Sequence, residues 1–255
     1  MSLRAALRGL IRRFGLDVVR YAPVDQQSLP GDFDQGTASL IRRVRPFTMT
    51  SPERLFALIK AVKYVSEAGI PGDIVECGVW RGGSMMAAAL TLLERGDDSR
   101  DLYLFDTYEG MTPPTDRDVS IDGQTARALL NTESKAESGS TWCIAPVDQV
   151  RAAMHSTGYS AARMHFIAGR VEETIPERAP ARISILRLDT DWYESTHHEL
   201  KYLYPLISQG GVLIIDDYGH WKGARQAVDE YITESGAKLL LNRIDYTGRI
   251  AVKAL

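Results

Sequence analysis

Cysteine, excess basic charge and long apolar runs are all scarce in this sequence of 255 residues. Its two cysteines, Cys77 and Cys143, form no CxxC pair, which argues against a zinc ribbon or a disulfide framework and fits a reducing compartment. The formal net charge of −3 argues against a nucleic-acid binder, which needs a basic surface. No apolar run approaches the roughly 18 residues of a membrane-spanning helix. These absences predict a cytoplasmic protein that does not bind nucleic acid.

A signal peptide and a dinucleotide-binding fingerprint are also missing. Arg12 and Arg13 interrupt the apolar stretch near the amino terminus, so this stretch does not resemble a secretory signal. A glycine-rich turn does begin at Gly78, but the pattern GxGxxG requires a second glycine where Trp80 stands. A pyrophosphate therefore has no obvious backbone cradle, which argues against NAD or FAD as a cofactor.

Two apolar runs that end in carboxylates organise the rest of the chain. They span Ile183 to Leu188 and Gly211 to Ile215, and their composition is typical of strands buried on both faces of a parallel sheet. The segment between them, Thr190 to Ile207, has the apolar stripe of a crossover helix. Because ligands bind at the carboxyl ends of such strands, the acids there predict a hard-cation site. These acids are Asp189, Asp191, Asp216 and Asp217.

The first predicted strand, Asp73 to Gly78, runs into a glycine-rich turn that ends at Ser84, and a helix begins at Met85. A strand, a turn and a helix N-terminus together form a corner that accepts phosphate or carboxylate groups. Glu76, near the end of this strand, is well placed for a cationic ligand group. The second strand, Leu102 to Phe105, ends at Asp106, and a carboxylate at this position suits ribose hydroxyls.

The remaining patterns complete an α/β fold. We predict a seven-stranded, mostly parallel sheet with helices on both faces and an antiparallel hairpin at its C-terminal end. Residues 48–255 carry this domain, residues 1–47 form an N-terminal helical arm, and an insertion at about 107–142 forms a lid. The further strands are predicted at 164–168, 238–244 and 249–252, and the further helices at 37–44, 52–68, 148–157 and 224–235.

Residues 1–21 have the pattern of an amphipathic, basic helix, with Leu3, Leu7 and Leu10 on one stripe and arginines on the other faces. Two interpretations stay open for this helix. The favoured one is that it docks on the core or on a second subunit, which predicts a homo-oligomer. The other is contact with a membrane surface.

Acids near the ends of the first two strands of such a sheet are the layout of class I S-adenosylmethionine-dependent methyltransferases, which have a Rossmann-like fold. More specifically, the chain from Thr48 to the C-terminus resembles the macrocin O-methyltransferase family, whose members methylate sugars of antibiotics. The segments that carry the resemblance are FTMTS (Phe47 to Ser51), GDIVECGVWRGGS (Gly72 to Ser84), FDTYEG (Phe105 to Gly110), LRLDTDWY (Leu186 to Tyr193) and IDDY (Ile215 to Tyr218).

The resemblance implies a role for each matching residue. Those implied for the methionine part of S-adenosylmethionine are Met49, Thr50, Glu76, Gly78, Gly82, Gly83 and Ser84. Asp106 and Thr107 match the residues at the ribose, and Gly169 and Arg170 those near the adenine. The acids that match the Mg²⁺ ligands of the family are Asp189, Asp216 and Asp217, and Asp191 matches the proposed general base. Three carboxylates also suit Mn²⁺ or Ca²⁺.

The chemistry of sugar methylation is consistent with these groups. A sugar hydroxyl is a poor nucleophile, and a bound cation lowers its pKa and orients its oxygen. We therefore expect cation-dependent O-methylation of a sugar, either on a small natural product or on a polysaccharide. Asp216 and Asp217 are adjacent, so in an extended strand they point to opposite faces, and both reach one ion only if the chain turns there.

Two other functions stay open at this point. Asp189, Thr190 and Asp191 form a DxD triplet of the kind that holds a metal and a nucleotide-sugar in some glycosyltransferases. That hypothesis leaves Glu76, the glycine-rich turn and Asp106 without a role. The chain could also be a non-catalytic protein that binds S-adenosylmethionine and docks through its N-terminal helix.

Overall fold

The computed structural model of the chain describes residues 13, 29–135 and 140–254. The chain divides into two units, Met1–Asp32 and Phe33–Leu255, and the helices and strands given below lie in the second. The helix predicted over residues 1–21 lies outside the described residues, residue 13 excepted. In the described part of the chain, every helix is too short or too polar to cross a membrane.

A sheet of seven strands forms the centre of the second unit, in the order β3-β2-β1-β4-β5-β7-β6. The first five strands of this order pair in parallel, and β7 pairs antiparallel with both β5 and β6. The predicted fold class is therefore confirmed. β4 is buried along its whole length, as expected for a strand covered on both faces. The strands are β1 (Asp73–Cys77), β2 (Leu102–Asp106), β3 (Met164–Ala168), β4 (Ile183–Leu188), β5 (Ile207–Ile215), β6 (Asn242–Arg243) and β7 (Arg249–Val252).

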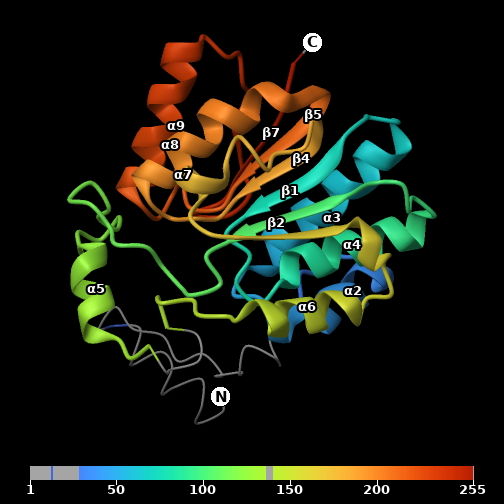
Figure 1. Cartoon of the computed structure of the whole chain (residues 1–255), viewed down its shortest axis with the longest axis horizontal. Helices are drawn as coiled ribbons and strands as arrows, with labels where there is room; N and C mark the ends of the chain where they lie inside the picture. The colour runs from blue at the N-terminus through green and yellow to red at the C-terminus, as the bar shows by residue number, and fades with distance from the viewer. Residues whose placement is uncertain (1–12, 14–28, 136–139, 255) are drawn as a thin grey trace. The chain divides into compact units, whose positions relative to one another are not determined.

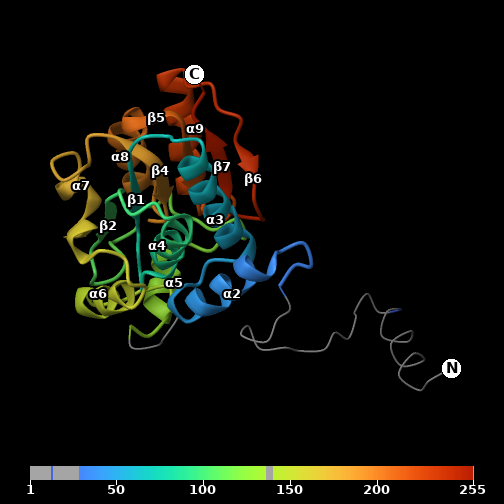
Figure 2. The ribbon, with the colours of Figure 1, turned by 90° about the vertical axis from the view of Figure 1, so that its right-hand side faces the viewer.

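Helices cover both faces of the sheet (Figure 1). On one face α8 packs against α7 and α9, and on the other face α4 packs against α2, α3 and α6, an arrangement that Figure 2 shows from the side. α5 lies in the insertion that follows β2. The helices are α2 (Gln35–Val44), α3 (Pro52–Glu67), α4 (Gly83–Arg95), α5 (Ala126–Thr132), α6 (Val147–His155), α7 (Val171–Thr174), α8 (Tyr193–Leu203) and α9 (Lys222–Ser235).

The start of α3 is built as its sequence predicts. The Ser51 side chain accepts a hydrogen bond from the Arg54 backbone N–H, and Pro52 occupies the first helical position. Its apolar stripe is buried, and burial of each such side chain contributes roughly 1.5–3 kcal/mol. The stripe consists of Leu55, Leu58, Ile59, Val62 and Val65. Because α3 is anchored in this way, its first turn is held at the carboxyl edge of the sheet, where the acids lie.

The bounds of α8, β5 and β6 differ from those predicted. Ile207 begins β5, whereas the sequence pattern places it in the crossover helix. α8 ends at Leu203, because Pro205 in the following 3₁₀ turn cannot continue an α-helix. Ile207 then pairs with Ile183, and a shift in register before Val212 accommodates the extra residues. β6 is shorter than the predicted 238–244, since its pairing with β7 covers only Asn242 and Arg243.

The insertion after β2, predicted to be a lid, is fastened to the domain through its middle. Asp118 is fully buried and accepts a hydrogen bond from the Tyr193 backbone N–H, at the start of α8, at 2.8 Å. The N–H of Ile121 donates to the carbonyl of His220 at 2.8 Å, and the N–H of Lys222 donates to the carbonyl of Val119 at 2.9 Å. The insertion therefore lies against the loop that follows β5.

Candidate active site

Most of the predicted cofactor residues and all the predicted acids line one cavity of about 220 Å³ at the carboxyl ends of β1, β2, β4 and β5. All four acids contribute to the lining. So do most of the predicted cofactor residues: Met49, Thr50, Gly78, Ser84, Asp106, Thr107, Gly169 and Arg170. In the described part of the chain, Glu76, Gly82 and Gly83 are not among the lining residues. The structure thus brings the two predicted sites together.

Glycine is required where the turn after β1 meets its neighbours. Gly78 has a φ of +82°, and a Cβ atom there would lie 2.0 Å from the carbonyl oxygen of Asp189. Gly82, with a φ of +88°, is the N-cap of α4. A Cβ atom on Gly83 would lie 2.7 Å from the carbonyl carbon of Phe47. The turn after β1, the turn after β4 and the segment before α3 therefore meet at backbone contact.

Asp106, predicted for ribose, organises the turn after β1. Its carboxylate accepts hydrogen bonds from the backbone N–H groups of Val79 at 2.7 Å, Trp80 at 2.9 Å and Tyr108 at 2.7 Å. Burial raises the pKa of Asp106, and these hydrogen bonds oppose the rise. Trp80 has a φ of +47°, which is unfavourable for a residue with a side chain, and its bond to Asp106 stabilises that conformation. Contact with ribose stays a prediction.

A buried arginine, Arg187 of β4, connects the cofactor side to the acids. It forms ion pairs with Glu76, with Asp189 at 2.7 Å and with Asp216 at 2.6 Å, and it donates to the Thr50 hydroxyl at 2.9 Å. Burial raises the pKa of Glu76 to about 8, although Arg187 opposes the rise. Within the described residues, Glu76 Oε2 is buried and has no hydrogen-bond partner. Glu76 thus keeps an acceptor for the cationic ligand group predicted at this position.

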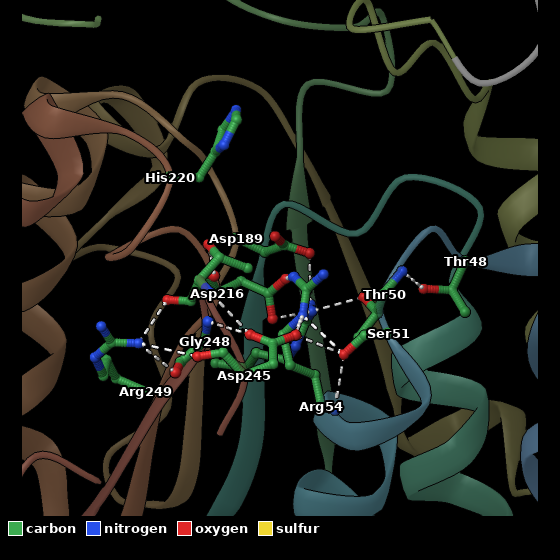
Figure 3. A network of polar contacts seen from close by, with 12 residues as sticks. Thr48, Thr50, Ser51, Arg54, Asp189, Asp216, His220, Asp245, Gly248 and Arg249 are labelled. Carbon is green, nitrogen blue, oxygen red and sulfur yellow. Dashed lines mark hydrogen bonds and ion pairs between the residues drawn. The ribbon is translucent and has the colours of Figure 1, made fainter. Parts of the chain in front are cut away.

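Asp216 also faces a second arginine, Arg54 in the first turn of α3 (Figure 3). The Nε atom of Arg54 contacts Asp245, in the turn between β6 and β7, at 3.0 Å. The Ser51 hydroxyl donates to the same carboxylate at 2.7 Å. Asp216 therefore belongs to a network of ion pairs that joins α3, β4 and the C-terminal hairpin.

Three carboxylates, those of Asp189, Asp191 and Asp217, have oxygens within 4.8 Å of one another. Burial raises the pKa of Asp191 to about 7, and repulsion from Asp189 adds to the rise. Burial, together with the charges of Asp191 and Asp189, also raises the pKa of Asp217. Asp217 Oδ2 is buried and lacks a hydrogen-bond partner among the described residues. A divalent cation would offset the repulsion among the three carboxylates and would be coordinated by the unpartnered oxygen. The three acids therefore fit a hard cation.

The cluster differs in one member from the ligands predicted from the sequence. Asp191 is in it and Asp216 is not. β5 ends at Ile215, and in the bend that follows it Asp217 meets the other acids, whereas Asp216 contacts Arg54 and Arg187.

Residues of the insertion complete the cavity beside the acids. Met111, Thr112 and Cys143 line it, and the Trp192 indole N–H donates to the carbonyl of Thr112 at 2.9 Å. Trp192 is 2% exposed and packs edge-on against Trp221, with ring centroids 5.0 Å apart. Trp192 is thus part of the support beneath the site.

Sequence reasoning does not identify Arg54 and Arg187. A signal for Arg187 exists, because a lone charge inside an apolar strand is costly unless it is paired. Arg54 offers no such signal, since a polar residue in the first turn of a helix is ordinary. Its partners Asp216 and Asp245 lie 162 and 191 residues away in the sequence.

The sequence and the fold are similar to those of O-methyltransferases. Residues 34–252 match the family model described as Macrocin-O-methyltransferase (TylF). The 8-demethyl-8-(2,3-dimethoxy-alpha-L-rhamnosyl)-tetracenomycin-C 4'-O-methyltransferase of Streptomyces olivaceus is 35% identical over 201 residues, which are 79% of this chain and 73% of that protein. Mycinamicin III 3''-O-methyltransferase of Micromonospora griseorubida is 31% identical over 201 residues, which are 79% and 76% of the two chains. The solved structure of the O-methyltransferase NovP is 29% identical, covers 82% of this chain and 83% of its own, and superimposes with a TM-score of 0.70.

The family match spans the first turn of α3, the turn after β1 and the acids that follow β4 and β5. The glycosyltransferase hypothesis and the non-catalytic hypothesis are therefore set aside. The chain belongs to the macrocin O-methyltransferase family, and it is an S-adenosylmethionine-dependent O-methyltransferase.

Proposed function

We propose that this methyltransferase acts on a hydroxyl of a sugar and uses a divalent cation to do so. The observation that carries the proposal is the cluster of three carboxylates in the same cavity as the turn after β1. The name of the Streptomyces relative includes a rhamnosyl group, which supports a sugar acceptor. The acceptor class is a sugar on a natural product or on a glycan.

On the cofactor side, S-adenosylmethionine would supply an electrophilic methyl group for transfer to the acceptor oxygen. Gly78 and Ser84 would hold its methionine part, with Met49 and Thr50 beside them in the cavity. The free oxygen of Glu76 would accept a hydrogen bond from its ammonium group. The remaining contacts predicted from the sequence, at the ribose and the adenine, belong to residues that also line the cavity.

On the acceptor side, Asp189 and Asp217 would hold the cation, which would lower the pKa of the acceptor hydroxyl and orient its oxygen. Asp191 would accept the proton from that hydroxyl, because its carboxylate lies in the same cavity beside Asp189 and Asp217. Arg187 contacts Asp189 at 2.7 Å and keeps its carboxylate oriented. A role for Asp216 as a ligand requires its carboxylate to leave Arg54 and Arg187, with which it is paired here.

Calorimetry on the purified protein tests the proposal. We expect micromolar binding of S-adenosylhomocysteine, binding of Mg²⁺ to the wild type, and loss of Mg²⁺ binding in Asp217→Asn. Asp122→Asn, at an exposed acid outside the cluster, is the matched control and should bind Mg²⁺ normally. A screen of rhamnosides and related glycosides with and without EDTA then measures turnover. Turnover that is insensitive to EDTA would overturn the cation dependence, and methylation confined to acceptors without a sugar would overturn the acceptor class.

A further inference from the structure

The turn that carries two of the clustered acids has a strained backbone. Asp191 has a φ of +66°, and the N–H of Trp192 donates to the carbonyl of Thr190 at 2.7 Å. A hydrogen bond between residues i and i+2 around a positive φ is the mark of the rarer, strained kind of γ-turn. Such a conformation is unfavourable by itself and persists only where surrounding contacts hold it. Contacts with neighbouring elements must therefore stabilise this turn.

Residues 189–191, which follow β4, are called the acid turn below. Thr190 lies between the two acids of this turn and forms a hydrogen bond with α8. Its hydroxyl donates to Oε2 of Glu199 at 3.1 Å, and Glu199 is fully buried. Cys77, the residue before Gly78, lies against the same carboxyl group: burial raises the pKa of the Cys77 thiol, and Glu199 adds to the rise. Glu199 thus contacts the residue between the two acids and the residue that precedes the turn after β1.

Glu199 has no place in the proposed chemistry, and its burial is costly. Burial raises the pKa of Glu199 well above its ordinary value, against the effect of the Thr190 hydroxyl. Its Oε1 is buried and has no hydrogen-bond partner among the described residues. The neighbouring core positions of α8, Leu200 and Leu203, are apolar. An apolar side chain would be less costly at position 199 if the contact with Thr190 had no role.

We propose that Glu199 is a positioning residue, which holds Asp189 and Asp191, through Thr190, in the geometry that completes the acid cluster with Asp217. The inference deepens the proposed function and rests on its cation site. It assigns to Glu199 no contact with substrate or cofactor.

Two pairs of variants test the contact from both ends. Thr190→Val keeps the shape of the side chain and removes the hydroxyl, whereas Thr190→Ser keeps the hydroxyl. Glu199→Leu removes the acceptor, whereas Glu199→Gln keeps an acceptor oxygen in a neutral group. Thr190→Val and Glu199→Leu should therefore disturb the turn, whereas Thr190→Ser and Glu199→Gln should behave like the wild type.

The first readout is hydrogen exchange of the Trp192 amide, followed by NMR. Its protection should fall about tenfold in Thr190→Val and Glu199→Leu, the size expected for one lost hydrogen bond, and stay within about twofold in the conservative variants. The second readout is calorimetry. Mg²⁺ affinity should fall about tenfold in the disruptive variants while S-adenosylhomocysteine affinity stays within about twofold. The double variant, with Thr190→Val and Glu199→Leu combined, should bind Mg²⁺ no more weakly than either single variant, because both changes remove the same contact.

The outcomes separate the inference from the proposed function. Unchanged protection of the Trp192 amide in Thr190→Val and Glu199→Leu overturns the positioning role, whether or not the protein binds Mg²⁺. A parallel loss of Mg²⁺ and S-adenosylhomocysteine affinity also overturns it, because it indicates a general structural role. Wild-type protein that binds S-adenosylhomocysteine but not Mg²⁺ refutes the cation site, while altered protection of Trp192 still supports positioning. If Glu199→Leu does not fold, the two Thr190 variants decide.

Discussion

Replacing Gly78 with alanine should damage the turn after β1 and the acid turn together. A φ of +82° is unfavourable for alanine by about 1–2 kcal/mol. The new Cβ atom would also lie 2.0 Å from the Asp189 carbonyl oxygen, so one backbone must move, and overpacking of this kind costs about 1–3 kcal/mol. We therefore expect the free energy of unfolding, measured in urea, to fall by about 2–5 kcal/mol. Affinity for S-adenosylhomocysteine, measured by calorimetry, should fall at least about tenfold.

Gly96→Ala is the matched control. Gly96 ends α4 with a φ of +67°, and a Cβ atom there would meet nothing within 4 Å. This variant has the conformational cost without the steric contact, so the difference between the two variants isolates the contact, at about 1–3 kcal/mol. Equal unfolding midpoints and equal cofactor affinity for the two variants would refute the argument that the two turns meet at backbone contact.

Three further predictions follow from the site. Asp191→Asn should lower turnover by about 10²–10⁴-fold and leave S-adenosylhomocysteine affinity unchanged; wild-type turnover in this variant would exclude Asp191 as the base. Arg187→Met should lower the free energy of unfolding in urea by about 3–5 kcal/mol, because Glu76 and Asp189 lose the counter-charge of Arg187 and Asp216 keeps only Arg54; an unchanged value would contradict this. Burial raises the pKa of Asp245, but hydrogen bonds from Gly248 and Ser51 and the charge of Arg54 outweigh this effect, so the pKa is lowered overall. Its stabilising effect is thus present above its unfolded pKa of about 3.9 and lost as the pH falls further, and Asp245→Asn should flatten the acid limb of a plot of unfolding free energy against pH.

Much of the fold followed from patterns in neighbouring residues. An apolar run bounded by acids, such as Ile183 to Leu188, is a local property, and the structure has β4 at those residues. Ser51 followed by Pro52 marks the start of α3 in the same way. The carboxyl ends of parallel strands share one edge of a sheet, so the sequence also predicted that the acids after β4 and β5 would gather at that edge. The sequence alone therefore determined the fold class and the location of the site.

Only the tertiary structure decided which side chains contact one another there. The direction of each acid depends on the twist and ending of its strand, so Asp217 joins the cluster while Asp216 pairs with Arg54 and Arg187. The contact between Thr190 and Glu199 depends on how α8 packs beneath the acid turn. These pairs come from elements whose relative placement is set by burial of the whole core. No pattern of neighbouring residues records that placement, because each contact joins side chains that meet only after the sheet and both helical layers have assembled.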